Sequence, residues 1–184
     1  MPSPLVAICD LDGTLIDSDR ALVDAFVNLG VAEEEITFGH VLSAECARFG
    51  ISVDEYVAAY DIEAAQPFPG VTELIAGLGE WAVCSNKHPI SGIAELERLG
   101  WSPRVAMFAD TFDGPKSPRP VLAVLEIDPD RAIFLGDTAH DRACANEAGV
   151  RFVLAGWNPR AVPESGDLIL SDPMDLLELL GQSA

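Results

Sequence analysis

The stretch that decides the fold lies near the start of the chain and reads VAICDLDGTL, residues 6–15. The apolar run at residues 5–9 is short and continuous, as a strand buried on both faces requires, and the Gly-Thr pair that follows breaks it. In open α/β sheets, ligands bind at the carboxyl ends of the strands. Asp10 and Asp12 therefore lie where a ligand is expected, and both could face one small volume unless the chain bends there.

Two carboxylates this close in the sequence indicate either a functional site or a plain solvated turn. They repel one another unless a cation lies between them or one of them holds a proton. A hard cation such as Mg²⁺ takes oxygen ligands, and a protonated carboxyl beside an ionised one can act as a general acid/base. A solvated turn is the alternative that the tetrapeptide DLDG leaves open on its own.

Strand and helix patterns alternate along the rest of the chain. Apolar runs predict further strands at residues 81–84, 105–108, 132–135, 152–154 and 167–170. Helical spacing predicts helices at residues 71–78, 90–99, 120–125 and 173–180. This alternation predicts an α/β fold in which a Rossmann-like parallel sheet is flanked by helices.

The segment between the first strand and PFPG at residues 67–70 has no apolar strand run. It has helical spacing at residues 20–29, 39–49 and 53–60, which predicts a small α-helical cap inserted after the first strand. The expected division is a core of residues 1–16 and 69–184 and a cap of residues 17–68, hinged near 17–19 and 67–70. Such a cap excludes water and selects the leaving group. Arg20, His40 and Arg48 are candidate substrate contacts there, with plain surface exposure as the alternative.

Four segments resemble a known family. DLDGTL at residues 10–15 resembles the first motif of the haloacid dehalogenase (HAD) superfamily of phosphohydrolases, and three more segments match its later motifs in order. They are WAVCSNK at 81–87, GPKSP at 114–118 and AIFLGDTAHD at 132–141. The third departs from the family's usual Lys-Pro order, because a serine follows Lys116. The cap resembles that of phosphoglycolate-phosphatase-like members but is shorter.

The resemblance implies roles for the two leading carboxylates and a metal. Asp10 would attack phosphorus and form an aspartyl-phosphate, and Asp12 would be the acid/base that protonates the leaving oxygen and then activates water. Mg²⁺ would be held by a side-chain oxygen of Asp10, the backbone carbonyl of Asp12 and the side chain of Asp137.

The later motifs would supply the remaining parts. Lys116 would neutralise the nucleophile and the phosphate, and Ser85 and Asn86 would also contact the phosphoryl oxygens. Asp141 would orient Lys116 or a metal-bound water without binding the metal itself. Taken alone, Ser85 could cap a helix and Lys116 could be solvated. The four motifs in order favour the functional interpretation.

The implied function is that of a Mg²⁺-dependent phosphatase acting on a small phosphorylated metabolite. Asp12 argues against dehalogenases that attack carbon, which do not need this acid/base. A phosphomutase of the β-phosphoglucomutase type is one alternative, and a non-catalytic HAD-fold binding module is another. The intact set of motif residues argues against the module.

Composition limits the partners. The formal net charge of −19 disfavours nonspecific binding to nucleic acid or to an anionic membrane. No apolar run is long enough to span a bilayer and the start of the chain lacks a signal-peptide pattern, so the expected location is cytoplasmic. The four cysteines lack C-x-x-C spacing and are expected to be reduced packing residues. A monomer and a homodimer both suit such a core.

Overall fold

A six-stranded parallel sheet forms the centre of the protein. The computed structural model describes residues 5–37 and 41–181. The strand order is β5-β4-β1-β6-β7-β8, and every neighbouring pair is parallel. These strands confirm the predicted Rossmann-like sheet, and they are β1 (Val6–Cys9), β4 (Trp81–Cys84), β5 (Val105–Met107), β6 (Ala132–Gly136), β7 (Arg151–Ala155) and β8 (Leu168–Leu170).

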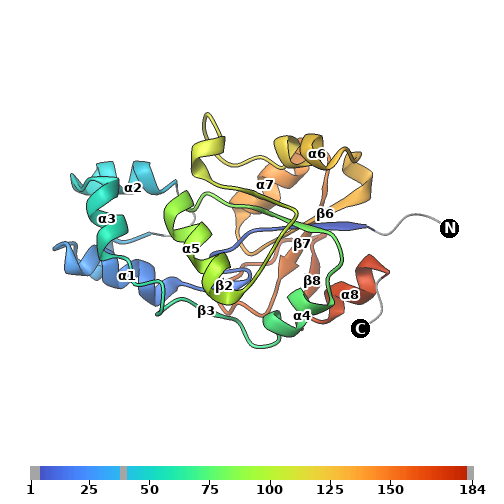
Figure 1. Cartoon of the computed structure of the whole chain (residues 1–184), viewed down its shortest axis with the longest axis horizontal. Coiled ribbons are helices and arrows are strands. Elements are labelled where there is room, and N and C mark those ends of the chain that lie inside the picture. The colour runs from blue at the N-terminus through green and yellow to red at the C-terminus, as the bar shows by residue number, and fades with distance from the viewer. Residues whose placement is uncertain (1–4, 38–40, 182–184) are drawn as a thin grey trace.

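Helices cover both faces of the sheet (Figure 1). On one face the core is completed by α4 (Val71–Gly77), α5 (Pro89–Leu99) and α8 (Asp175–Leu180), and on the other by α6 (Arg119–Leu125) and α7 (Ala139–Ala148). Strand β1 shows why its sequence is apolar throughout: Ala7 and Cys9 pack on the first face, and Val6 and Ile8 on the second.

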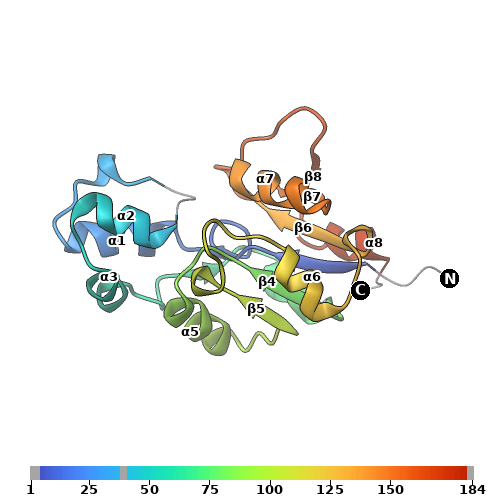
Figure 2. The ribbon, with the colours of Figure 1, turned by 90° about the horizontal axis from the view of Figure 1, so that it is seen from above.

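Three helices lie together at one end of the molecule, away from α8, in both views (Figure 1 and Figure 2). They are α1 (Asp19–Asn28), α2 (Leu42–Phe49) and α3 (Val53–Ala59). Aromatic rings hold them together, since the Phe26 ring centroid is 4.7 Å from that of Tyr56 and 5.5 Å from that of Phe49. The helix expected at residues 39–49 begins at Leu42, and residues 39–40, including the candidate contact His40, lie outside the described part of the chain.

Two very short strands connect this helical group to the sheet. They are β2 (Ile16–Asp17) and β3 (Gln66–Pro67), which pair antiparallel. The sequence did not predict them, because two residues are too few to show a strand period. Single-turn 3₁₀ helices complete the connections, at Glu33–Glu35, Ala109–Thr111 and Pro129–Arg131. Within the described residues, no helix combines the length and apolar character needed to cross a membrane.

Candidate active site

The first motif turns sharply at the end of β1. The Leu11 carbonyl accepts hydrogen bonds from the amides of Leu15 and Ile16, both at 2.9 Å, and Gly13 takes the left-handed conformation with φ of 76°. The chain therefore bends between the two carboxylates, so Asp10 pairs with Lys116 and Asp12 with Lys87, although both line the same cavity.

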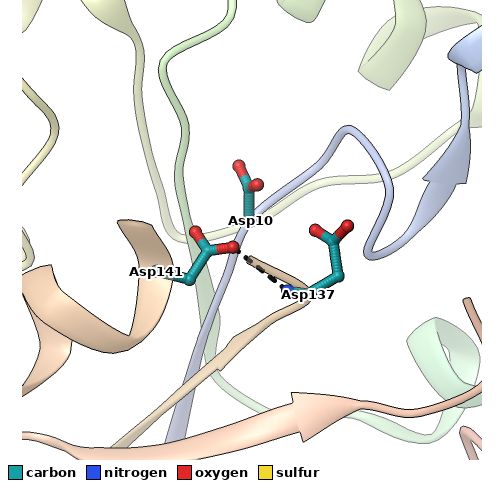
Figure 3. A group of neighbouring side chains, drawn as sticks. All are labelled: Asp10, Asp137 and Asp141. Atoms are coloured by element: carbon teal, nitrogen blue, oxygen red, sulfur yellow. Dashed lines mark hydrogen bonds between the residues drawn. The ribbon is translucent and has the colours of Figure 1, made fainter. Parts of the chain in front are cut away.

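Three buried carboxylates meet at the carboxyl end of β1 and β6 (Figure 3). Asp10 follows β1, Asp137 follows β6, and Asp141 lies in the first turn of α7. One oxygen of each lies within 4.8 Å of the others. Cys9 pairs with Leu135 in the neighbouring parallel strand. This pairing brings Asp10 and Asp137 together, although they lie 127 positions apart in the sequence.

Lys116 supplies the positive charge of this cluster. Its Nζ lies 2.8 Å from Oδ1 of Asp10 and 2.6 Å from Oδ1 of Asp141. Burial acts to lower the pKa of the Lys116 ammonium, but the two carboxylates outweigh burial and raise it well above its usual range. The Asn86 side-chain oxygen accepts the backbone N–H of Lys116 at 2.8 Å, so Asn86 holds the Lys116 loop in place.

Asp141 already has partners for both of its oxygens. While Oδ1 faces Lys116, Oδ2 accepts the amide of Asp137 at 3.1 Å and the amide and hydroxyl of Thr138 at 2.8 and 2.7 Å. Burial acts to raise the pKa of Asp141, yet Lys116 and the Thr138 bonds outweigh it and the pKa is lowered. Asp141 thus anchors Lys116 and completes the capping box of α7 with Thr138.

Asp137 is held by two neutral donors. The Thr14 hydroxyl donates to Oδ1 at 2.9 Å, and the Asn158 amide donates to Oδ2 at 2.8 Å and to the Gly13 carbonyl at 2.8 Å. Asn158 is a contributor that the sequence did not reveal. It lies in the loop after β7, in no recognised motif.

Electrostatics favour a cation beside Asp10 and Asp137. Burial raises the pKa of Asp137 to about 7, helped by the charges of Asp141 and Asp10. Burial also raises the pKa of Asp10 to about 6, against the effect of Lys116. A divalent cation would offset the cost of ionising both buried groups, and an all-oxygen donor set suits Mg²⁺. The residues present therefore fit the metal expected from the sequence.

Asp12 lies outside the three-carboxylate cluster. Its Oδ1 accepts the Ser18 hydroxyl at 2.5 Å and the Lys87 ammonium at 2.8 Å. Lys87 is buried and also contacts Tyr60 and Glu95. Like Asn158, Lys87 was not predicted as a site residue.

A cavity of about 350 Å³ connects these groups to the helical group. Asp10, Asp12, Ser85 and Asn86 line it, and Ser85 donates a hydrogen bond that helps to lower the pKa of Asp10. The lining residues from α1, α2, α3 and the loop between α1 and α2 include Leu22, Phe26, Thr37, Leu42, Glu45 and Tyr56.

The two described candidates for substrate contacts do not line this cavity. Arg20 has 69% of its side chain exposed and pairs with Asp24, and Arg48 pairs with Glu45 at 2.5 Å. Both bind acidic neighbours within the helical group, which is the surface alternative that the sequence left open.

With this geometry in place, comparison with known proteins identifies the family. The model of haloacid dehalogenase-like hydrolases matches residues 7–155. The chain belongs to this hydrolase family. The match includes all four motifs that carried the resemblance.

Relatives of this hydrolase align over almost their whole lengths. A phosphoglycolate phosphatase of Aquifex aeolicus is 30% identical, covering 95% of this chain and 96% of the relative. An N-acetylmuramic acid 6-phosphate phosphatase of Pseudomonas aeruginosa is 25% identical over 95% and 93%. The crystal structure of CbbY from Rhodobacter sphaeroides superposes with a TM-score of 0.75 at 23% identity, covering 97% of this chain and 99% of that one, which shows the shared fold.

Proposed function

We propose that the protein is a Mg²⁺-dependent phosphatase that hydrolyses a small phosphomonoester through an aspartyl-phosphate on Asp10. The observation that carries this proposal is the Lys116 ammonium, which lies 2.8 Å from Asp10 beside the Asp137 carboxylate. A phosphate dianion repels an attacking carboxylate, so cations must surround the nucleophile. The two curated relatives described above are both named as phosphatases of phosphomonoesters.

The proposed reaction has two displacements at phosphorus. First, a carboxylate oxygen of Asp10 forms a bond to phosphorus, the bond from phosphorus to the ester oxygen breaks, and Asp12 gives its proton to that oxygen. Second, a water attacks phosphorus and gives a proton to Asp12, and the bond between phosphorus and the Asp10 oxygen breaks. Inorganic phosphate leaves, and both carboxyl groups return to their starting states.

The other residues take supporting roles in this proposal. The side chains of Asp10 and Asp137 and the backbone carbonyl of Asp12 would hold Mg²⁺, which when bound supplies positive charge next to the phosphate. Lys116 and Ser85 would bind phosphoryl oxygens, with Asp141 holding Lys116 in place. The Asn86 side-chain oxygen is already used by the Lys116 amide, so its part in phosphate binding would be indirect.

The surroundings support a small substrate under a cap. A cavity of about 350 Å³ suits a metabolite, and residues 17–68 would form the cap that encloses the leaving group. The cytoplasm is the proposed setting, which the four free, buried cysteines favour.

The test is release of inorganic phosphate from p-nitrophenyl phosphate and a panel of small phosphomonoesters. We expect turnover by the native protein with Mg²⁺, and none after treatment with EDTA or in Asp10→Asn. Restoration by added Mg²⁺ would show that EDTA removed the cofactor. A folded protein that binds Mg²⁺ but turns over no ester would contradict the proposal and favour the mutase or the binding module.

A further inference from the structure

A chain of four polar side chains runs from Asp12 into the helical group. The Lys87 ammonium lies 2.8 Å from Oδ1 of Asp12, 3.0 Å from the Tyr60 hydroxyl and 3.1 Å from Oε1 of Glu95. Lys87 follows β4, Glu95 lies on α5, and Tyr60 ends α3. Lys87 and Glu95 have 5% and 0% of their side chains exposed, so water does not compete for these contacts.

Three partners surround the Lys87 ammonium. It donates hydrogen bonds to Asp12 and Tyr60 and forms an ion pair with Glu95. The Tyr60 hydroxyl accepts from Lys87 and donates its own proton to Oε1 of Glu95 at 2.8 Å. The direction of each hydrogen bond in the chain is therefore determined, and the Lys87 ammonium is fixed from three sides.

These contacts constrain only one of the two carboxylate oxygens of Asp12. Lys87 and the Ser18 hydroxyl both donate to Oδ1, and neither donates to Oδ2. Because both donors occupy Oδ1, Oδ2 is the oxygen left to face the leaving oxygen of a substrate. They also stop the carboxyl group from rotating.

We propose that Lys87 is a positioning residue that holds Asp12 so that Oδ2 passes the proton to the leaving oxygen, with Glu95 and Tyr60 fixing Lys87 in turn. This assignment rests on the proposed phosphatase function. Tyr60 extends the chain into the cap, so the proton donor is in place only when α3 sits against the core.

The alternative is that Lys87 has a purely structural role, and the experiment must distinguish it from the positioning role. Glu95 is fully buried, and Lys87 could serve only to neutralise it. Lys87→Met would then harm the protein by leaving a buried unpaired carboxylate, whatever the substrate. The double variant Lys87→Met/Glu95→Gln removes that carboxylate charge together with the ammonium, so it isolates the loss of the Asp12 contact.

The readout compares two substrates of similar shape, phenyl phosphate and p-nitrophenyl phosphate. Phenolate is the more basic leaving group and needs protonation more, so a misplaced acid affects phenyl phosphate more strongly. In Lys87→Met and in the double variant we expect kcat/KM to fall roughly tenfold to a hundredfold for phenyl phosphate and about threefold or less for p-nitrophenyl phosphate. Asp12→Asn should show the same bias more strongly.

The outcomes separate this proposal from the one on which it rests. Equal losses on both substrates, or recovery of phenyl phosphate turnover in the double variant, would overturn the role of Lys87 while native activity stands. If the Asp10→Asn variant keeps the p-nitrophenyl phosphatase activity of the native protein, both the proposed function and this inference are overturned. If Lys87→Met does not fold, the double variant carries the comparison, with thermal unfolding as the check of its fold.

Discussion

Gly13 lies where the backbone comes closest to the Asp137 carboxylate. A Cβ atom at this position would lie 2.4 Å from Oδ2 of Asp137, and the φ of 76° is itself unfavourable for other residues. Gly13→Ala is therefore expected to displace Asp137 and to raise the Mg²⁺ concentration needed for half-maximal activity by at least about tenfold.

The matched control for Gly13→Ala is Gly30→Ala. Gly30 has φ of 90°, but nothing lies within 4 Å of an added Cβ. Both variants should lose about 1–2 kcal/mol of unfolding free energy from the left-handed backbone, and only Gly13→Ala should change the Mg²⁺ requirement. A shifted Mg²⁺ requirement in both would contradict the steric explanation.

Asn158 ties the loop after β7 to Asp137 and Gly13. Asn158→Ala removes a donor to Asp137, so the carboxylate loses its orientation. We expect about 10- to 100-fold weaker activation by Mg²⁺ in a titration of phosphatase activity. Asn146→Ala, at an exposed position on α7, is the control and should titrate like the native protein. An unchanged Mg²⁺ titration in Asn158→Ala would show that Asn158 does not contribute to the site.

Three of the residues predicted from the sequence share a property that Asn158 lacks. Asp10, Ser85 and Asp137 each follow an apolar run, so strand order alone places them at one edge of the sheet. Asn158 reaches Gly13 across 145 residues from a loop without any strand or helix signal. Lys87 lies inside a recognised motif. Its contacts with Glu95 and Tyr60 depend on how α5 and α3 pack, and local sequence patterns do not predict that packing.

At the scale of elements, α3 depends on its N-cap residue, Ser52. The Ser52 hydroxyl accepts the Glu55 amide at 3.2 Å, and the Glu55 carboxylate accepts the Ser52 amide at 2.9 Å, which forms a capping box. Ser52→Ala should lower the unfolding free energy by about 1 kcal/mol in urea titrations, since the Glu55 amide loses its partner. Ser52→Thr keeps a capping hydroxyl and should lose much less. Equal stability of the two variants would contradict this account.

Elements were predictable where burial imposes a long pattern. All six strands of the large sheet were expected from apolar runs, because a strand covered on both faces has no polar positions. The pair β2 and β3 was not expected, since its position depends on how residues 16–17 and 66–67 meet after folding. The sequence likewise did not determine whether the chain turns after β1. This turn separates Asp12 from the cluster of Asp10, Asp137 and Asp141.

At the scale of the whole molecule, metal and pH are expected to act on stability together. The raised pKa values of Asp10, about 6, and Asp137, about 7, mean that both carboxyls stabilise the metal-free fold in protonated form at low pH. That contribution is lost as the pH rises through these values, and a cation binds only the ionised form. Saturating Mg²⁺ should therefore raise Tm by roughly 5–10 °C at about pH 8 and much less at about pH 5.

The Mg²⁺-dependent rise in Tm has a direct control. Asp137→Asn removes a charged ligand, so Mg²⁺ should no longer shift its melting curve at either pH. A shift of the same size at both pH values in the native protein would show that the two carboxyls do not bind the ion.

Strand β1 is the first strand of the chain and the third in the sheet, between β4 and β6. On the ribosome it emerges early, just before the proposed nucleophile Asp10; its first neighbour β4 ends at residue 84, and its second neighbour β6 is complete only at residue 136. Asp137 and Asn158 emerge later still. A nascent chain thus carries an apolar strand with one edge unpaired, and lacks part of the proposed site, for most of its synthesis. A premature stop codon before codon 137 would leave an inert fragment prone to aggregation.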